Sequence, residues 1–337
     1  MLPVLEVNNL KTHFFLDEGV LKAVDGVSFK VSEKQTLGII GESGCGKSIT
    51  AQSILQIVPH PGRIVDGEII LYTDGEEPVF INQLDPFGKT IRDIRGRQIA
   101  MIFQEPMTSL SPIHTVGDQI MEALLLHETQ NRTEARDIAL DMLNRVGINN
   151  PSQRIEELPH QLSGGMRQRV MIAMALCCEP KLLIADEPTT ALDVTVQAQI
   201  LELLQELQGP SGMSMIYITH DLSVIAEIAD EVAVMYLGRI VEQGPTREIL
   251  DNPLHPYTQR LLKSVPKLGH KARSRLETIE GNVPIPLDPP RRCGFFSRCP
   301  ESKTGVCDVD IPALLEKNKK HSVCCFLHSD EIEGVEG

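Results

Sequence analysis

The octapeptide GESGCGKS, residues 41–48, constrains the fold of this chain more than any other segment. It follows the apolar segment TLGII and precedes ITAQSILQIV, which has the composition of a helix. The pattern G-x-x-x-x-G-K-S between a strand and a helix lets successive backbone N–H groups converge on phosphate oxygens. The N-terminus of the following helix adds positive potential. The sequence therefore predicts a nucleotide-phosphate site at the end of a buried strand.

Within this loop, Lys47 is expected to reach the outer phosphates, and the Ser48 hydroxyl is expected to bind Mg²⁺. The side chain of Cys45 is interpreted as a small filler rather than a ligand. The loop backbone and the first residues of the helix should contact the nucleotide. These residues are Gly41, Ser43, Gly44, Cys45, Gly46, Lys47, Ser48 and Ile49.

A second apolar strand, LLIADEP at residues 182–188, ends in two neighbouring acids. Adjacent strand residues point to opposite sides, so Asp186 and Glu187 are expected to have different roles. Beside the phosphate loop, one acid can hold Mg²⁺ through water and the other can face the attacking water. We assign Asp186 to the metal and Glu187 to the water.

Two more apolar segments end in polar residues. MSMIYITH ends at His220, for which a γ-phosphate contact is favoured over a purely structural role. MIFQEP carries Gln104, whose amide can turn toward the metal or the water. The expected catalytic group is therefore Glu187, His220 and Gln104.

The order of predicted elements indicates an α/β fold. Residues 3–40 alternate apolar segments with turns, and EARDIALDMLNRV has helical spacing that Gly147 ends. Strand–helix–strand alternation in the second half predicts a parallel sheet. Prolines become dense beyond residue 245, which predicts a loop-rich C-terminal segment.

Composition excludes several classes of function. The 337-residue chain carries a net charge of −14, which argues against coating nucleic acid or adhering to anionic lipid. Its N-terminus lacks the pattern of a signal peptide, and its longest apolar run, residues 170–178, is far short of the ~20 residues that span a bilayer. We expect a cytoplasmic chain whose membrane role, if it has one, depends on a partner.

One further segment, LSGGMRQR at residues 162–169, distinguishes among the protein families that share a phosphate loop. With GESGCGKS, the LLIADE strand, ALD at 191–193 and His220, it closely resembles the ATP-binding-cassette (ABC) family. The resemblance implies a P-loop NTPase fold of ABC type, with a parallel-sheet core, an antiparallel β part and a helical subdomain near residues 105–177. We expect this domain to cover residues 1–250, and a cysteine-rich extension to cover 251–337.

The segment LSGGMRQR predicts a second anion site. Ser163, Gly164 and Gly165 lie at the expected start of a helix, and the chain already has one phosphate loop. In the family, two such domains pair head to tail, and this segment contacts the partner's ATP. The resemblance also places Asp193 at the dimer interface and Phe14 against adenine, with Phe15 as the alternative and a core role competing for Phe14.

Two segments narrow the resemblance to oligopeptide and dipeptide importers: residues 103–120 and 252–266. This implies an ATPase subunit with Mg²⁺ and ATP as cofactors, on the cytoplasmic face of the cell membrane. The implied partners are a second ATPase subunit, different or identical, two permease subunits that contact residues 107–112, and indirectly a substrate-binding protein. Importers of nickel chelates or other solutes, and a non-transport ATPase acting on nucleic acid, remain alternatives.

The C-terminal cysteines are spaced Cys-x5-Cys-x7-Cys-x17-Cys, without a C-x-x-C knuckle. A reducing compartment disfavours disulfides. The residues alone therefore leave two interpretations: a metal ion that organises the segment, or buried free thiols. The resemblance to peptide-importer ATPases, some of which hold a 4Fe–4S cluster, implies such a cluster here. Its expected ligands are Cys293, Cys299, Cys307 and Cys325, with Cys324 spare; zinc remains an alternative.

Overall fold

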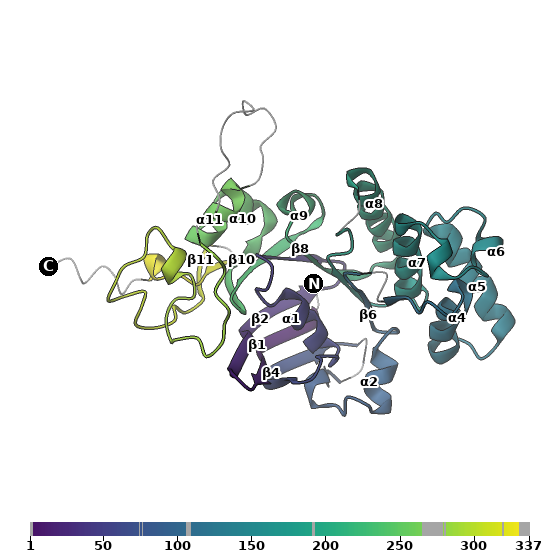
Figure 1. The fold of residues 1–337 in the computed structure, drawn as a ribbon, viewed down its shortest axis with the longest axis horizontal. Coiled ribbons are helices and arrows are strands. Elements are labelled where there is room, and N and C mark those ends of the chain that lie inside the picture. The colour runs from purple at the N-terminus through teal and green to yellow at the C-terminus, as the bar shows by residue number, and fades with distance from the viewer. Residues whose placement is uncertain are drawn as a thin grey trace.

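The computed structural model describes residues 3–73, 75, 77–105, 109–190, 193–264, 279, 281–318 and 320–329. Two sheets and a group of helices form the molecule (Figure 1). The two hydrophobic cores lie on opposite faces of the larger sheet, because alternate residues of its strands belong to different cores: Ile39 to one and Ile40 to the other.

The smaller sheet is antiparallel, with strand order β2-β1-β4-β5. Its strands are β1 (Pro3–Leu16), β2 (Gly19–Ser32), β4 (Gly62–Leu71) and β5 (Val79–Phe80). Val7, Leu10, Val27 and Ile69 are fully buried, whereas intervening residues such as Glu6 and Asn8 are only half-buried. This is the period-2 pattern of a sheet with one face toward a core.

In the described part of the chain, the larger sheet has eight strands, in the order β11-β12-β10-β9-β3-β8-β7-β6. The five strands from β9 to β6 are parallel, which confirms the predicted parallel sheet. They are β9 (Glu231–Tyr236), β3 (Thr36–Ile40), β8 (Ser214–Thr219), β7 (Leu182–Asp186) and β6 (Ile99–Ile102). Every residue of β3, β6, β7 and β8 is buried, because both faces are covered.

Among the described residues, the helical subdomain contains the α-helices α4 (Val116–His127), α5 (Arg132–Arg145), α6 (Pro151–Arg154) and α7 (Gly164–Leu176), which lie together at one end of the molecule (Figure 1). All fall inside the predicted range 105–177. Thr115 caps α4 by accepting a hydrogen bond from the Asp118 N–H, and Asn131 caps α5 in the same way. Gly147, at φ +74°, follows the end of α5 where the sequence predicts a stop.

The other helices flank the sheets: α1 (Lys47–Ile54), α2 (Lys89–Ile94), α8 (Val194–Ser211), α9 (Leu222–Ile228), α10 (Thr246–Asp251) and α11 (Pro256–Lys263). None of the helices in the described ranges combines the length and apolar character needed to cross a bilayer.

The C-terminal segment is loop-rich, as expected, but it also extends the larger sheet. β12 (His321–Val323) pairs with β10 (Arg239–Pro245), and β11 (Leu315–Asn318) pairs with β12. Beneath this edge, His321 Nε2 lies 2.8 Å from Glu242 Oε1, and both side chains are almost inaccessible to solvent. The segment is therefore joined to the main fold by backbone pairing and by a buried polar contact.

Candidate functional site

The phosphate loop lies between β3 and α1, and its glycines are required by close backbone approach. A Cβ atom on Gly46, which has φ +103°, would lie 2.2 Å from the Ala23 carbonyl oxygen. A Cβ atom on Gly41 would lie 2.2 Å from the Met235 carbonyl oxygen. Glycine alone permits this path of the chain, which leads into the N-terminus of α1.

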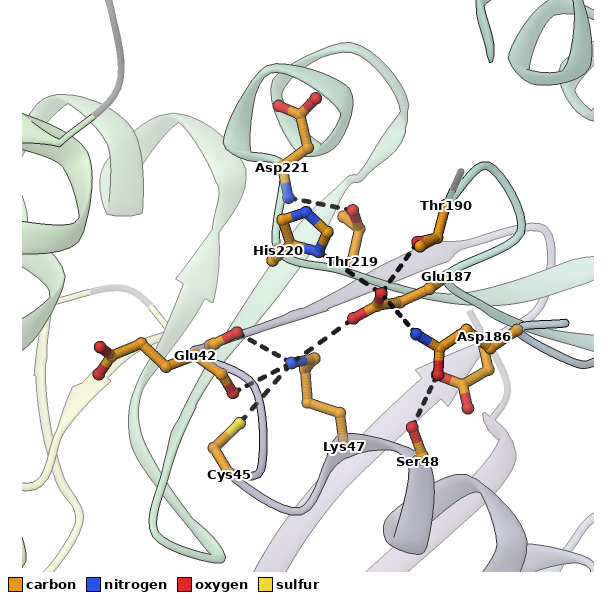
Figure 2. Close-up of polar contacts among 12 residues, drawn as sticks. Glu42, Cys45, Lys47, Ser48, Asp186, Glu187, Thr190, Thr219, His220 and Asp221 are labelled. Atoms are coloured by element: carbon orange, nitrogen blue, oxygen red, sulfur yellow. Dashed lines mark hydrogen bonds and ion pairs between the residues drawn. The ribbon is translucent and has the colours of Figure 1, made fainter. Parts of the chain in front are cut away.

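Lys47 occupies the centre of the loop (Figure 2). Its Nζ donates hydrogen bonds to the carbonyl oxygens of Gly41 at 2.9 Å and Glu42 at 3.2 Å, and it lies 3.9 Å from Glu187 Oε1. Only 5% of its side chain is exposed. The ammonium group is thus held by two carbonyl oxygens, with the Glu187 carboxylate farther away, at the position where phosphate oxygens are expected. Cys45 packs beside it with a buried thiol, whose pKa is raised by burial.

The two acids at the end of β7 contact different groups. Ser48 Oγ donates to Asp186 Oδ1 at 3.1 Å, and burial raises the pKa of Asp186. The Glu187 backbone has φ +46°, and its side chain turns away from Ser48 toward Lys47 and His220 (Figure 2). The Ser48–Asp186 pair is a compact oxygen group of the kind that a magnesium ion prefers.

Donors surround the Glu187 carboxylate. Gln104 Nε2 donates to Oε2 at 3.2 Å, and Thr190 Oγ1 donates to the same oxygen at 2.9 Å. His220 Nδ1 lies 3.5 Å from that oxygen. The residues come from the ends of β6, β7 and β8, which are parallel and therefore end at one edge of the sheet. The structure thus brings Gln104, Glu187 and His220 together; Thr190 was not identified from the sequence.

The residues expected to contact a second nucleotide lie on other elements. Ser163 caps α7, with Oγ accepting from Met166 N at 3.3 Å, and both Ser163 and Gly164 are exposed. Asp193 caps α8 by accepting from Val196 N at 3.0 Å. In Figure 1, α7 belongs to the helical subdomain, apart from α1. Residues 106–108 and 191–192 lie outside the described residues, so the expected permease contact at 107–112 is described only from Ser109 onward.

The two aromatic candidates on β1 have different surroundings. Phe14 is half-buried and packs against Gly62, where a Cβ atom would lie 2.7 Å from its ring. Phe15 is 39% exposed, and the Arg63 guanidinium lies 4.1 Å from its ring centroid. Neither ring belongs to the fully buried core.

Glu42, at a variable position of the loop pattern, was not identified from the sequence. Its N–H donates to Tyr257 Oη at 2.9 Å, and its carboxylate accepts hydrogen bonds from Arg298 in the C-terminal segment. No signal in the sequence links these positions, because Arg298 is 256 residues away.

Four C-terminal cysteines line one small cavity: Cys293, Cys299, Cys307 and Cys325. Cys324 lines a different cavity, and its Sγ donates to the Pro312 carbonyl oxygen at 2.9 Å. Burial raises the pKa of Cys293 to about 11 and that of Cys325 to about 12. Within the described ranges, no three His, Cys, Asp or Glu side chains form a group that could hold a metal ion. The structure therefore places the four predicted ligands around one cavity without a formed metal site.

Comparisons with known proteins give consistent results. The ABC transporter family model matches residues 24–190, and the model of the oligopeptide/dipeptide transporter C-terminal region matches residues 241–307. A probable peptide ABC transporter ATP-binding protein of Sinorhizobium fredii is 49% identical, covering 98% of this chain and 96% of the relative. The dipeptide transport ATP-binding protein DppD of Bacillus subtilis is 48% identical, covering 99% and 97%.

Among solved structures, a dimeric post-hydrolysis ATP-binding cassette bound to ADP and Pi has a TM-score of 0.63 and 27% identity, covering 72% of this chain and 99% of that one. This similarity confirms the cassette fold. Because the sequence similarity to ABC transporter ATP-binding proteins extends over nearly the whole chain, the chain belongs to the ABC transporter family.

Proposed function

We propose that this chain is the ATP-hydrolysing subunit of an ABC importer that powers the uptake of dipeptides and oligopeptides. The observation that most supports peptides as the transported solute is the match of residues 241–307 to the C-terminal region of oligopeptide/dipeptide transporters. Relatives named for peptide or dipeptide transport, similar over nearly the full length, support the same class. Nickel chelates and nucleic acid receive no comparable support.

The donor set at the phosphate loop fits Mg·ATP. Lys47 would exchange its carbonyl acceptors for phosphate oxygens, and Ser48 with Asp186 would hold the metal. The bound Mg²⁺ would neutralise charge on the outer phosphates. The main-chain N–H groups of residues 41–49 would complete the phosphate cradle. Phe14, half-buried on β1, is assigned to adenine.

Glu187 is assigned to the attacking water. Its Oε2 already accepts from Gln104 and Thr190, which fixes the carboxylate and leaves its second oxygen facing Lys47. A carboxylate held in this way can accept a proton from water and orient that water toward the terminal phosphate. His220, 64% exposed, is free to turn from Glu187 to the terminal phosphate. Gln104 would contact the metal or the water.

The exposed N-terminus of α7 would contact the nucleotide of a partner. Ser163, Gly164 and Gly165 lie at a helix start, where backbone N–H groups have no intrahelical acceptor, and Ser163 and Gly164 are exposed to another chain. The working unit would pair this chain with a second ATPase subunit, and a heterodimer is favoured. It would bind two permease subunits from the cytoplasmic face of the membrane, with residues 107–112 at that contact and a substrate-binding protein delivering the solute.

We assign residues 1–250 to the nucleotide-binding domain and residues 251–337 to the C-terminal extension. In the extension, a 4Fe–4S cluster held by Cys293, Cys299, Cys307 and Cys325 is proposed. Four thiols around one cavity match the ligand number of such a cluster. Burial disfavours the thiolate forms of Cys293 and Cys325 in the absence of positive charge, which iron would supply.

Solute uptake by cells tests the proposed function. A strain lacking the gene should lose uptake of a radiolabelled dipeptide and keep uptake of nickel, and the wild-type chain should restore the peptide uptake. Unchanged dipeptide uptake together with lost nickel uptake would overturn the assigned solute class.

A further inference from the structure

A cavity of about 710 Å³ lies between the β1–β2 hairpin, the turn that joins β9 to β10, and the C-terminal extension. Small-molecule sites commonly have volumes of about 300–1,000 Å³. The hairpin contributes Lys11 and His13, whereas Thr12 between them faces α1, with its Oγ1 2.8 Å from Ser53 Oγ. The cavity is therefore on the opposite side of the hairpin from α1, the helix that follows the phosphate loop.

The lining of the cavity is basic, although the chain is strongly acidic. Its cations outnumber its carboxylates: Lys11, Lys22, Arg239, Arg291 and Arg292 against Asp25 and Asp310. Three of these cations have acidic partners, in the pairs Lys11–Asp66, Arg239–Asp25 and Arg291–Asp310. Lys22 and Arg292 form no ion pair with any residue that the structure describes. Lys22 is thus available to an anion, and so is Arg292, although its guanidinium also lies 5.3 Å from the Phe296 ring centroid.

One buried nitrogen beside the cavity has only a long polar contact. His13 Nε2 is inaccessible to solvent and makes no hydrogen bond to any described residue, and the nearest carboxylate oxygen, Asp25 Oδ1, is 3.5 Å away. At 3.5 Å the His13–Asp25 contact is longer than an ordinary N–H···O hydrogen bond, so this imidazole adds a weakly engaged polar group beside the cavity. Burial lowers the pKa of His13, and the neighbouring Asp25 carboxylate opposes this shift.

The remaining wall is apolar. The extension segment 284–290 contributes Ile285 and Leu287 among four prolines, and Phe295 and Val241 lie deeper in the fold. Ile285 is 79% exposed, although it is a large aliphatic side chain. A ligand that satisfies both parts of this lining has an anionic group and an apolar body.

We propose that this cavity is a binding site for a small organic anion with an apolar body, distinct from the nucleotide site. Its anionic group contacts Lys22 and Arg292, and its body packs against Ile285 and Leu287. The anionic group is a carboxylate or a phosphate ester, since both accept charge-assisted hydrogen bonds from lysine and arginine.

The dye 8-anilinonaphthalene-1-sulfonate has this chemistry and serves as the probe. Fluorescence titration of the purified full chain should show one saturable site whose affinity falls with added salt. In a Lys22→Gln/Arg292→Gln variant the affinity should fall by about tenfold or more. Arg247→Gln, which removes an exposed cation on α10, is the matched control and should leave the affinity unchanged.

A second variant tests the cavity by volume rather than by charge. A Cβ atom on Gly294, at the cavity wall, would make ordinary contact with Leu237 at 3.5 Å, so Gly294→Leu should fold and fill part of the space. It should also lower the affinity for the dye. Displacement by phenylpropanoate or by phenyl phosphate would identify the preferred anionic group. Equal dye affinity in the wild type and in both cavity variants, or displacement by neither compound, would overturn the proposal.

Discussion

Arg298 of the C-terminal extension forms a two-pronged ion pair with Glu42 of the phosphate loop. Nη1 lies 2.7 Å from Glu42 Oε2, and Nη2 lies 2.9 Å from Oε1. The Arg298 side chain is only 4% exposed, and its guanidinium also contacts Tyr236 Oη at 3.3 Å. Arg298 directly precedes Cys299, so one short segment connects the cysteine cavity to the nucleotide site.

Arg298→Gln should destabilise the protein and weaken ATP binding. It removes the cationic partner of the Glu42 carboxylate in a partly buried position, which costs about 2–4 kcal/mol of unfolding free energy. Urea denaturation measures this loss, and the KM for ATP should rise because the loop is less firmly held. Arg291→Gln is the control, since its pair with Asp310 is exposed and should contribute under about 1 kcal/mol. Equal losses in the two variants would contradict a supporting role for Arg298.

Two loop glycines should respond differently to alanine. Gly46→Ala combines a left-handed backbone with a Cβ atom 2.2 Å from the Ala23 carbonyl oxygen, so the loop must move and ATP binding should be lost. Gly44→Ala has only the left-handed backbone, φ +78°, with open space around the Cβ atom, and should cost about 1 kcal/mol. Isothermal titration with a non-hydrolysable ATP analogue compares them. Retained binding in Gly46→Ala would show that the loop path is not required.

The neighbouring cysteines Cys324 and Cys325 provide a matched pair for the proposed cluster. Cys325→Ser removes a thiol from the four-cysteine cavity, so iron content and visible absorbance of anaerobically purified protein should fall sharply. Cys324→Ser should leave both unchanged, because this thiol donates to Pro312 and lines the other cavity. A colourless, iron-free wild-type protein that is fully folded would exclude the cluster.

The Asp25–Arg239 pair should make stability depend on pH at the acid end. Burial alone would raise the pKa of Asp25. The Arg239 guanidinium, 2.6 Å away, more than offsets the effect of burial and holds the Asp25 pKa below its usual value. Lys22 and His13 also face the Asp25 carboxylate. Because the Asp25 pKa is lower in the folded state than in the unfolded state, the pair stabilises the fold at pH values above the unfolded-state pKa of about 3.9. This stabilisation is lost as the pH falls through the folded-state pKa.

Asp25→Asn should therefore lower the unfolding free energy by about 1–2 kcal/mol near neutral pH. Measured in a His13→Gln background, which removes the imidazole 3.5 Å from Asp25, the difference that Asp25→Asn makes should stay constant from about pH 8 to about pH 5 and shrink below about pH 4. Chemical denaturation across this range measures it. A difference that grows on acidification would reverse the assigned sign.

The edge of the sheet that holds the candidate catalytic residues could be predicted from the sequence, because parallel buried strands place their carboxyl ends together. Gln104, Glu187 and His220 each follow such a strand, so their proximity follows from the strand pattern. Contacts between distant loops carry no such pattern, and the Arg298–Glu42 pair could not be found in this way. β12 was missed because HSV is three residues long and lacks the alternation of a strand.

The central claim is that the Glu187 network activates water for ATP hydrolysis. The most direct measurement is ATP turnover by the purified full chain, comparing wild type with Glu187→Gln and with Glu179→Gln, which changes an exposed acid. Loss of the carboxylate should reduce turnover by about a hundredfold or more while ATP still binds, and Glu179→Gln should match wild type. Wild-type turnover in Glu187→Gln would contradict the assignment of the attacking water to this residue.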